Sequence, residues 1–257
     1  MTSDRVSADR VRPLLVGGGA LVAGVLAWWA IASFTNVPAY ILPTPLEVWK
    51  RAYELFATNA IQIQIAQTVA EIVQGSVIGI AVGLVLAMSF FHINWIQRLL
   101  MPLIVVAQVT PKISIAPLIV LWIGLGIGSK ITLVALVVFY PVLINMLARL
   151  NAMPPTYRDL AKITGMNPVR RAIRMELPYS LPALAAGIKL GLLAGVTAAV
   201  IGEFIGANAG LGFLEKQGQD NDDIRLVIVA LGLLSLLGVV LYWIVGVAER
   251  RIVRRFQ

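Results

Sequence analysis

The stretch Met153-Pro-Pro-Thr-Tyr-Arg-Asp-Leu-Ala-Lys-Ile-Thr-Gly165 is polar, although long apolar runs lie on both sides of it. Thr156 predicts a helix N-cap, and Asp159 three residues later gives an arrangement related to the capping box. Gly165 predicts the end of that helix, because glycine tolerates the left-handed conformation that follows many helix C-termini. A short helix on the surface is therefore expected from Thr156 to Gly165.

A second short helix is predicted directly after it. Asn167 is a favourable N-cap, and Pro168 suits the first helical position. We expect this helix to end before Leu177-Pro178, because proline cannot continue it. Its three arginines keep it basic: Arg170, Arg171 and Arg174. The two helices, joined at a glycine, form one loop at about 151–180.

The composition of the whole chain indicates a membrane protein. Of its 257 residues, 59% are hydrophobic and 13% are charged, and the mean hydropathy is +0.85. A soluble domain has about 25% charged residues. Apolar runs of about 20 residues are long enough to cross a bilayer. Such runs occupy 13–34, 66–91, 98–124, 130–150, 181–206 and 226–248. The expected fold is therefore all-α, with a tail at 1–12 and one six-span domain at 13–257.

The basic residues predict the orientation. Fourteen of the 21 Lys and Arg residues lie at the two ends of the chain and in the connections after the second and fourth runs. The opposite connections hold five. Since Lys and Arg are enriched in cytoplasmic loops, both termini and the 151–180 loop are expected in the cytoplasm. Basic residues scattered between apolar runs form no continuous face, so nucleic-acid binding is not expected.

A segment between the first two runs is predicted to lie in the membrane interface. Leu46, Trp49, Tyr53 and Phe56 recur there at helical spacing, while charged residues occupy the other side. This pattern is typical of a short amphipathic helix that does not span the bilayer.

Several chemistries are excluded by the residue types. The chain has no cysteine and a single histidine, His92. A thiolate or histidine metal cluster is therefore not expected, and we identify no catalytic constellation and no metal ligands. The phosphate-binding pattern G-x-x-x-x-G-K-[ST] is also absent. A P-loop nucleotide site is therefore not expected in this chain.

The polar loop resembles the "EAA" loop of binding-protein-dependent ABC importer permeases. That pattern is Glu-Ala-Ala, three residues, Gly, nine residues, then Ile-x-Leu-Pro. The chain matches it at Ala161, Gly165, Leu177 and Pro178, and departs from it conservatively at Asp159, Leu160 and Met175. The stretch 111–124 is similar to the third span of the nitrate, sulfonate and taurine branch.

The resemblance implies a type I importer permease of the inner membrane. Its loop would dock into a groove on a separate ATP-binding subunit, which would hold ATP and magnesium, so no cofactor is expected in this chain. A second permease copy, an extracytoplasmic solute-binding protein and membrane lipid are the other implied partners. The branch takes small anions or vitamin precursors. A capped hairpin without a docking role, a secondary transporter or channel, and an intramembrane enzyme are the alternatives.

Two runs carry a small residue at every fourth position. One row comprises Gly75, Gly79, Gly83 and Ala87, and the other Ala183, Gly187, Gly191, Gly195 and Ala199. Rows of small residues allow helix backbones to approach closely. Packing within one subunit and packing across a dimer are both compatible with this pattern.

The third run contains the candidate substrate pathway. Pro111 and Pro117 are expected to interrupt it, and broken helices near mid-membrane are where transporters bind substrates. The candidate residues are Gln108, Pro111, Lys112, Ser114 and, from the fifth run, Glu203. Lys112 has three interpretations: contact with an anionic substrate, snorkelling to the interface, or pairing with a glutamate. Glu71 and Glu203 either line the path or are solvated at the interface.

Overall fold

The computed structural model describes residues 19, 20, 22–35, 37–206 and 208–253, and the side chains of Arg158 and residues 251–253 are not described. These residues form helices joined by short turns. After an apolar helix at Val22–Phe34, the elements are α2 (Pro45–Ala57), α3 (Ala60–His92), α4 (Asn94–Val109), α5 (Lys112–Ile123), α6 (Ile127–Asn151), α7 (Pro155–Ile163), α8 (Pro168–Arg171), the π turn η1 (Ala172–Glu176), α9 (Leu177–Gly206), α10 (Leu211–Asp220) and α11 (Ile224–Val253).

Four of the predicted spans are confirmed as single long apolar segments. Within the described residues these are Ala60–His92, Ile127–Asn151, Pro168–Gly206 and Ile224–Arg250. The predicted 98–124 span is a bent pair, α4 and α5, and the helix direction changes by 106° between them. The predicted 13–34 span lies partly outside the described residues, and its described part is the short apolar helix that precedes α2. The all-α membrane fold is therefore confirmed.

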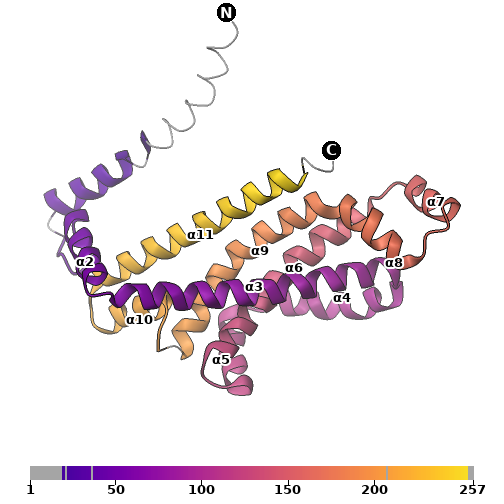
Figure 1. Cartoon of the computed structure of the whole chain (residues 1–257). Helices are drawn as coiled ribbons and strands as arrows, with labels where there is room; N and C mark the ends of the chain where they lie inside the picture. The colour runs from indigo at the N-terminus through magenta and orange to yellow at the C-terminus, as the bar shows by residue number, and fades with distance from the viewer. Residues whose placement is uncertain (1–18, 21, 36, 207, 254–257) are drawn as a thin grey trace, which may run out of the picture.

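The bend between α4 and α5 occurs at Thr110 and Pro111. Both have extended ψ angles, 129° and 123°. Proline has no N–H with which to continue the helix, and it disfavours a helical conformation of the residue before it. The predicted interruption at Pro117 is wrong, because α5 runs through it. Figure 1 shows α5 projecting crosswise from the long bundle.

Helix α6 lies at the centre of the bundle, between α3 and α9. A Cβ at Gly79 would lie 2.8 Å from the carbonyl oxygen of Ala135, and one at Gly187 would lie 2.8 Å from that of Pro141. Both small-residue rows therefore pack onto α6 of the same chain. In lipid, where apolar side chains gain little by leaving the solvent, such close approach stabilises helix pairs by van der Waals contact.

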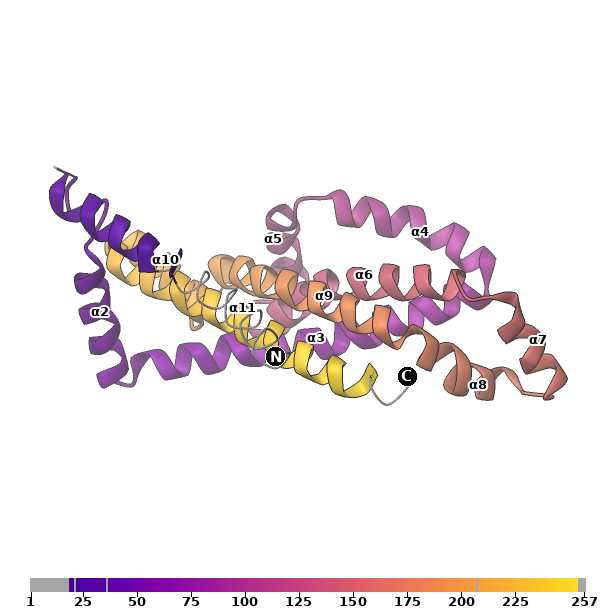
Figure 2. The same ribbon diagram turned by 90° about the horizontal axis from the view of Figure 1, so that it is seen from above.

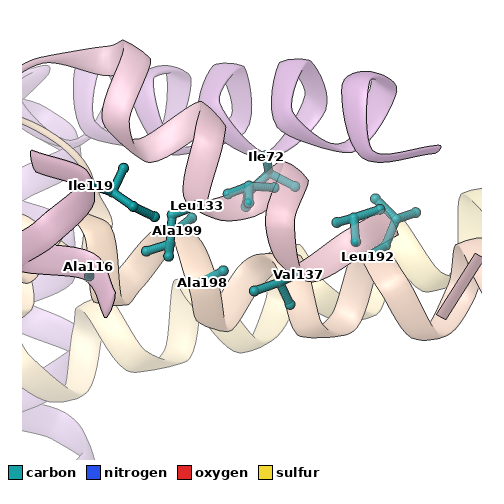
Figure 3. Close-up of a cluster of buried hydrophobic side chains, with 10 residues drawn as sticks. Ile72, Ala116, Ile119, Leu133, Val137, Leu192, Ala198 and Ala199 are labelled. Carbon is teal, nitrogen blue, oxygen red and sulfur yellow. The ribbon is translucent and has the colours of Figure 1, made fainter. Parts of the chain in front are cut away.

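The apolar core extends from this central packing to α5. Ile72 of α3, Leu133 and Val137 of α6 and Ala199 of α9 belong to one buried cluster, which also includes Ala116 of α5 (Figure 3). Through this cluster the short helix α5 is held against α6 and α9 although it lies across them.

The two ends of the bundle carry different elements. Figure 2 shows α7 and α8 projecting at one end, and α2 and α10 at the other. Helix α2 begins with a complete capping box between Thr44 and Glu47. The backbone N–H of Thr44 donates to Glu47 (2.8 Å), and this bond lowers the pKa of that carboxyl. The predicted apolar stripe is exposed, from 44% at Phe56 to 72% at Trp49.

Candidate substrate groove and ATPase-coupling loop

The polar loop forms a projecting pair of helices joined at Gly165, as predicted. Gly165 has φ +62°, and its N–H donates to the carbonyl of Lys162 (3.1 Å), while the N–H of Met166 donates to that of Ala161 (3.0 Å). These two bonds define a Schellman motif. Asn167 caps α8 through a 2.8 Å bond from the N–H of Arg170. The glycine and the asparagine thus perform the predicted capping functions.

Two details of the predicted loop are wrong. Thr156 is not the N-cap, because α7 begins at Pro155 with Pro154 in the capping position. Proline suits the first turn of a helix, where an N–H would have no partner. The second helix does not end before Leu177-Pro178 either, since η1 joins α8 to α9. The N–H of Leu177 reaches back to the carbonyl of Ala172, a π-type spacing. This wider turn accommodates the proline within a continuous span.

The loop residues identified from the sequence divide into outward and inward positions. Asp159, Leu160 and Gly165 are exposed, whereas Ala161 is buried. Met175, Leu177 and Pro178 are half-buried where the chain enters the bundle. Asp159 forms a surface ion pair with Lys162 at 3.7 Å, a kind of contact that is worth little by itself.

Large apolar side chains project from this end of the molecule. Leu160 is 50% exposed, Ile163 84%, Val169 67% and Ile173 61%. A polar, basic loop that exposes several large aliphatic side chains is typical of a protein-docking surface. In Figure 1 it stands clear of the bundle at the end opposite α10.

A groove of about 350 Å³ lies between the α4–α5 corner and helices α6 and α9. Gln108 and Lys112 line it together with Tyr140 of α6 and Thr197 of α9. The structure thus brings two of the predicted pathway residues together. Pro111 and Ser114 are exposed beside the corner but do not line the groove. Tyr140 and Thr197 were missed by sequence reasoning, because each lies in an otherwise apolar helical run.

Lys112 caps the end of α4. Its ammonium group donates to the carbonyls of Gln108 (2.8 Å), Ala107 (3.2 Å) and Thr110 (3.3 Å). These carbonyls lie at the helix C-terminus, where the partial charge is negative. The side chain is half-buried, and within the described part of the chain no glutamate forms an ion pair with it. The positive charge therefore stays at the groove wall and has backbone dipoles as its partners.

Glu203 lies away from the groove, in a buried cluster at the α10 end. It is 1% exposed and Glu71 is fully buried, so the interpretation that both are solvated at the interface is wrong. Glu203 accepts from the hydroxyl of Thr68 (2.6 Å) and from the N–H of Gly212. Burial is possible because the folded chain supplies these donors.

Glu71 has a partner that the sequence did not reveal. Lys130 of α6 lies 3.5 Å from it and is 4% exposed, and Gln67 donates to the same oxygen (2.8 Å). In the sequence, Lys130 is one of the five basic residues assigned to the connections opposite the 151–180 loop. Only the packing of α6 against α3 makes it the counter-ion of a buried carboxylate, which offsets part of the cost of burying either charge.

Comparison with known proteins identifies the family. Residues 79–254, more than half of the chain, match the family described as "Binding-protein-dependent transport system inner membrane component". The chain belongs to this family. It is 33% identical to the riboflavin transport system permease protein RibX of Chloroflexus aurantiacus over 88% of this chain and 85% of that one. It is also 29% identical to the formylaminopyrimidine transport permease ThiX of Halalkalibacterium halodurans, over 82% and 84%.

Other relatives support the same assignment. The putative aliphatic sulfonates transport permease SsuC of Escherichia coli is 29% identical, over 85% of this chain and 83% of that one. Among solved structures, the inward-facing MetNI methionine ABC transporter has a chain with TM-score 0.59 and 22% identity, covering 78% of this chain and 95% of that one. This last similarity shows a shared type I importer fold.

The protein is thus the permease subunit of an ABC importer in the inner membrane. Family membership decides against the secondary transporter, the channel and the intramembrane enzyme. It also implies that an ATP-binding subunit and a substrate-binding protein work with this chain.

Proposed function

We propose that α7 and α8 form the contact with a separate ATP-binding subunit, which binds ATP and magnesium and performs the hydrolysis. The single observation that carries this proposal is the strong exposure of four aliphatic side chains on a projecting basic loop (Figure 1), namely Leu160, Ile163, Val169 and Ile173. Burying such side chains in a partner's groove removes apolar area from water, which is worth about 25 cal/mol per Å² before the entropic cost of association is subtracted. The left-handed turn at Gly165 sets the angle between α7 and α8, and therefore the shape of this surface.

We further propose that two copies of this chain form the pore, with both termini and the coupling loop in the cytoplasm. The excess of Lys and Arg on the α7–α8 side supports this orientation. The dimer is supported by α5, which is too short to span a bilayer yet exposes Leu121 (75%) and Trp122 (74%). A second subunit is a suitable cover for apolar residues on a helix that lies crosswise.

The proposed substrate is a small anion or a vitamin precursor that passes along the Gln108–Lys112 groove. Lys112 supplies a positive charge at the groove wall, and Gln108, Tyr140 and Thr197 supply hydrogen-bonding side chains. The named relatives transport riboflavin, formylaminopyrimidine and aliphatic sulfonates. Binding assays on the partner solute-binding protein identify the compound directly. Glu203 is not proposed as a pathway residue here, because it lies outside the groove.

The coupling proposal is tested by two substitutions at Gly165 in the reconstituted importer. Gly165→Val should abolish uptake and substrate-stimulated ATP hydrolysis, because a β-branched residue resists φ +62°. Gly165→Asn should retain both, since asparagine tolerates the left-handed conformation. No neighbouring atom lies within 4 Å of a Cβ at this position, so the two variants differ in backbone preference and not in packing.

Native mass spectrometry of the same preparation should give two permease copies and two ATPase subunits. Normal uptake and ATP hydrolysis with Gly165→Val would show that the turn does not set the docking surface, and the coupling assignment would be wrong.

A further inference from the structure

Three side chains connect the coupling segment to the end of α3. Glu176 of η1 accepts from Arg171 of α8 (2.8 Å from Nε to Oε1) and lies 2.8 Å from Nε2 of His92, the last residue of α3. Arg171 also lies 3.1 Å from Nδ1 of His92. The side chain of Glu176 is only 3% exposed, whereas those of Arg171 and His92 are 30% and 28% exposed.

The hydrogen bonds of this triad require one form of the histidine. A guanidinium group has donors and no acceptor, so Nδ1 of His92 must accept and carry no proton. The proton then lies on Nε2, which donates to Glu176. Both carboxylate oxygens and both imidazole nitrogens are thereby paired: one oxygen with Arg171, the other with Nε2 of His92, and Nδ1 of His92 with Arg171. The triad is a closed ring of three contacts between α3, α8 and η1.

The triad lies where a displacement of α8 can be transmitted to the turn between α3 and α4. His92 lies two residues before α4 begins at Asn94. Helix α4 has no fully buried residue and packs on the core only through partly buried side chains such as Leu100 and Ile104, so what holds its first turn contributes to its position. The α4–α5 corner carries Gln108 and Lys112, which line the groove. A displacement of α8 that moves the α3–α4 turn therefore moves the groove wall.

We propose that the Arg171–Glu176–His92 triad is the joint through which the coupling loop moves α4, and thus the substrate groove. Arg171, Glu176 and His92 are positioning residues: they touch neither ATP nor substrate. This inference rests on the proposed contact of α7 and α8 with the ATPase. The loop reaches α9 through the backbone of η1, but it reaches the end of α3, directly before α4, through these side chains.

The test uses the complete reconstituted importer with single-residue variants. His92→Leu keeps an apolar side chain of similar size and removes both hydrogen bonds. His92→Gln keeps one donor and one acceptor and should rescue the wild-type behaviour. Arg171→Gln removes the charge from a partly exposed position, so it leaves folding intact. Glu249→Gln is the matched control, because Glu249 pairs with Lys189 between α11 and α9, away from α4.

Two quantities are measured. The first is the amount of substrate taken up per ATP hydrolysed. The second is the rate at which a single cysteine, introduced by Leu103→Cys on α4, reacts with a soluble maleimide in the presence and absence of ATP. The natural chain has no cysteine, so this label is specific. His92→Leu and Arg171→Gln should co-purify with the ATPase and hydrolyse ATP. Uptake per ATP should fall about tenfold, within the factors of about 5–150 typical of coupled sites. The effect of ATP on labelling should disappear.

Rescue by His92→Gln together with an unaffected control supports the joint. An Arg171→Gln importer with wild-type uptake per ATP and wild-type labelling would overturn it, whether or not His92→Leu assembles. The two proposals fail separately: an ATPase that does not co-purify with the wild-type chain rejects the docking surface, and the joint with it. If the ATPase binds the variants and uptake per ATP is unchanged, only the joint is rejected.

Discussion

One added methyl group at Gly210 should disturb a buried hydrogen-bonded cluster that joins α3, α9 and α10. Its N–H donates to Gln64 (2.6 Å), and the next two amides of the α10 N-terminus donate to Thr68 (2.8 Å) and to Glu203. Side chains of α3 and α9 thus satisfy amides that would otherwise have no partner at the start of a helix. A Cβ at Gly210 would overlap the carboxylate of Glu203.

Gly210→Ala should lower the free energy of unfolding in two ways. The first is backbone strain at φ +124°, about 1–3 kcal/mol in a region open almost only to glycine. The second is displacement of the Glu203 carboxylate from Thr68 and Gly212. Hydrogen bonds to charged groups are worth about 1.5–3 kcal/mol each, so losing both costs about 3–6 kcal/mol more.

A matched control separates these parts. Gly124 has φ +96° and an extended ψ of 168°, yet nothing lies within 4 Å of a Cβ there. Gly124→Ala should therefore carry the strain alone. At roughly 2–4 °C per kcal/mol for a chain of this size, Gly210→Ala should unfold at least about 6 °C below the control.

Unfolding is followed by intrinsic tryptophan fluorescence during heating in detergent, and the chain has six tryptophans. In a Glu203→Ala background the overlap is gone, so Gly210→Ala should then cost no more than Gly124→Ala does. If the two single variants unfolded within about 2 °C of each other, less than 1 kcal/mol would separate them. The overlap with Glu203 would then carry no energetic weight, and the account of this cluster would be refuted.

Two further predictions concern orientation and substrate. A cysteine at Asn221 should react with impermeant thiol reagents in intact cells, while one at Thr164 should resist them. The reverse pattern would place the coupling loop on the wrong side for an ATPase. Lys112→Met should assemble with its ATPase but lose uptake of an anionic substrate at least about tenfold. Lys112→Arg should retain part of the uptake, because the positive charge at the groove wall persists. Unchanged uptake kinetics in Lys112→Met would show that Lys112 only caps α4.

Much of the local structure of the coupling loop could be predicted from its own residues. Gly165 and Asn167 act on the backbone within a few residues of themselves, so their capping functions are visible in the sequence and recur in the structure. The start of α7 and the continuity at Leu177-Pro178 were predicted wrongly. In both cases a proline was expected to exclude helix but is accommodated in one. Pro155 lies in the first turn of α7, and Pro178 follows a π turn that keeps the helix continuous.

The sequence by itself determined that this chain lies in a membrane, where its four long single spans run, and which loop carries the family pattern. Those properties depend on hydrophobicity and short-range spacing, which need no knowledge of neighbours. Only the tertiary structure decided that Glu71 pairs with Lys130, that Glu203 caps α10, and that both glycine rows pack on α6 of the same subunit. The physical reason is that a buried charge or a close backbone approach is defined by its partner. For the ion pair and the glycine rows these partners lie about 45 to 60 residues away along the chain.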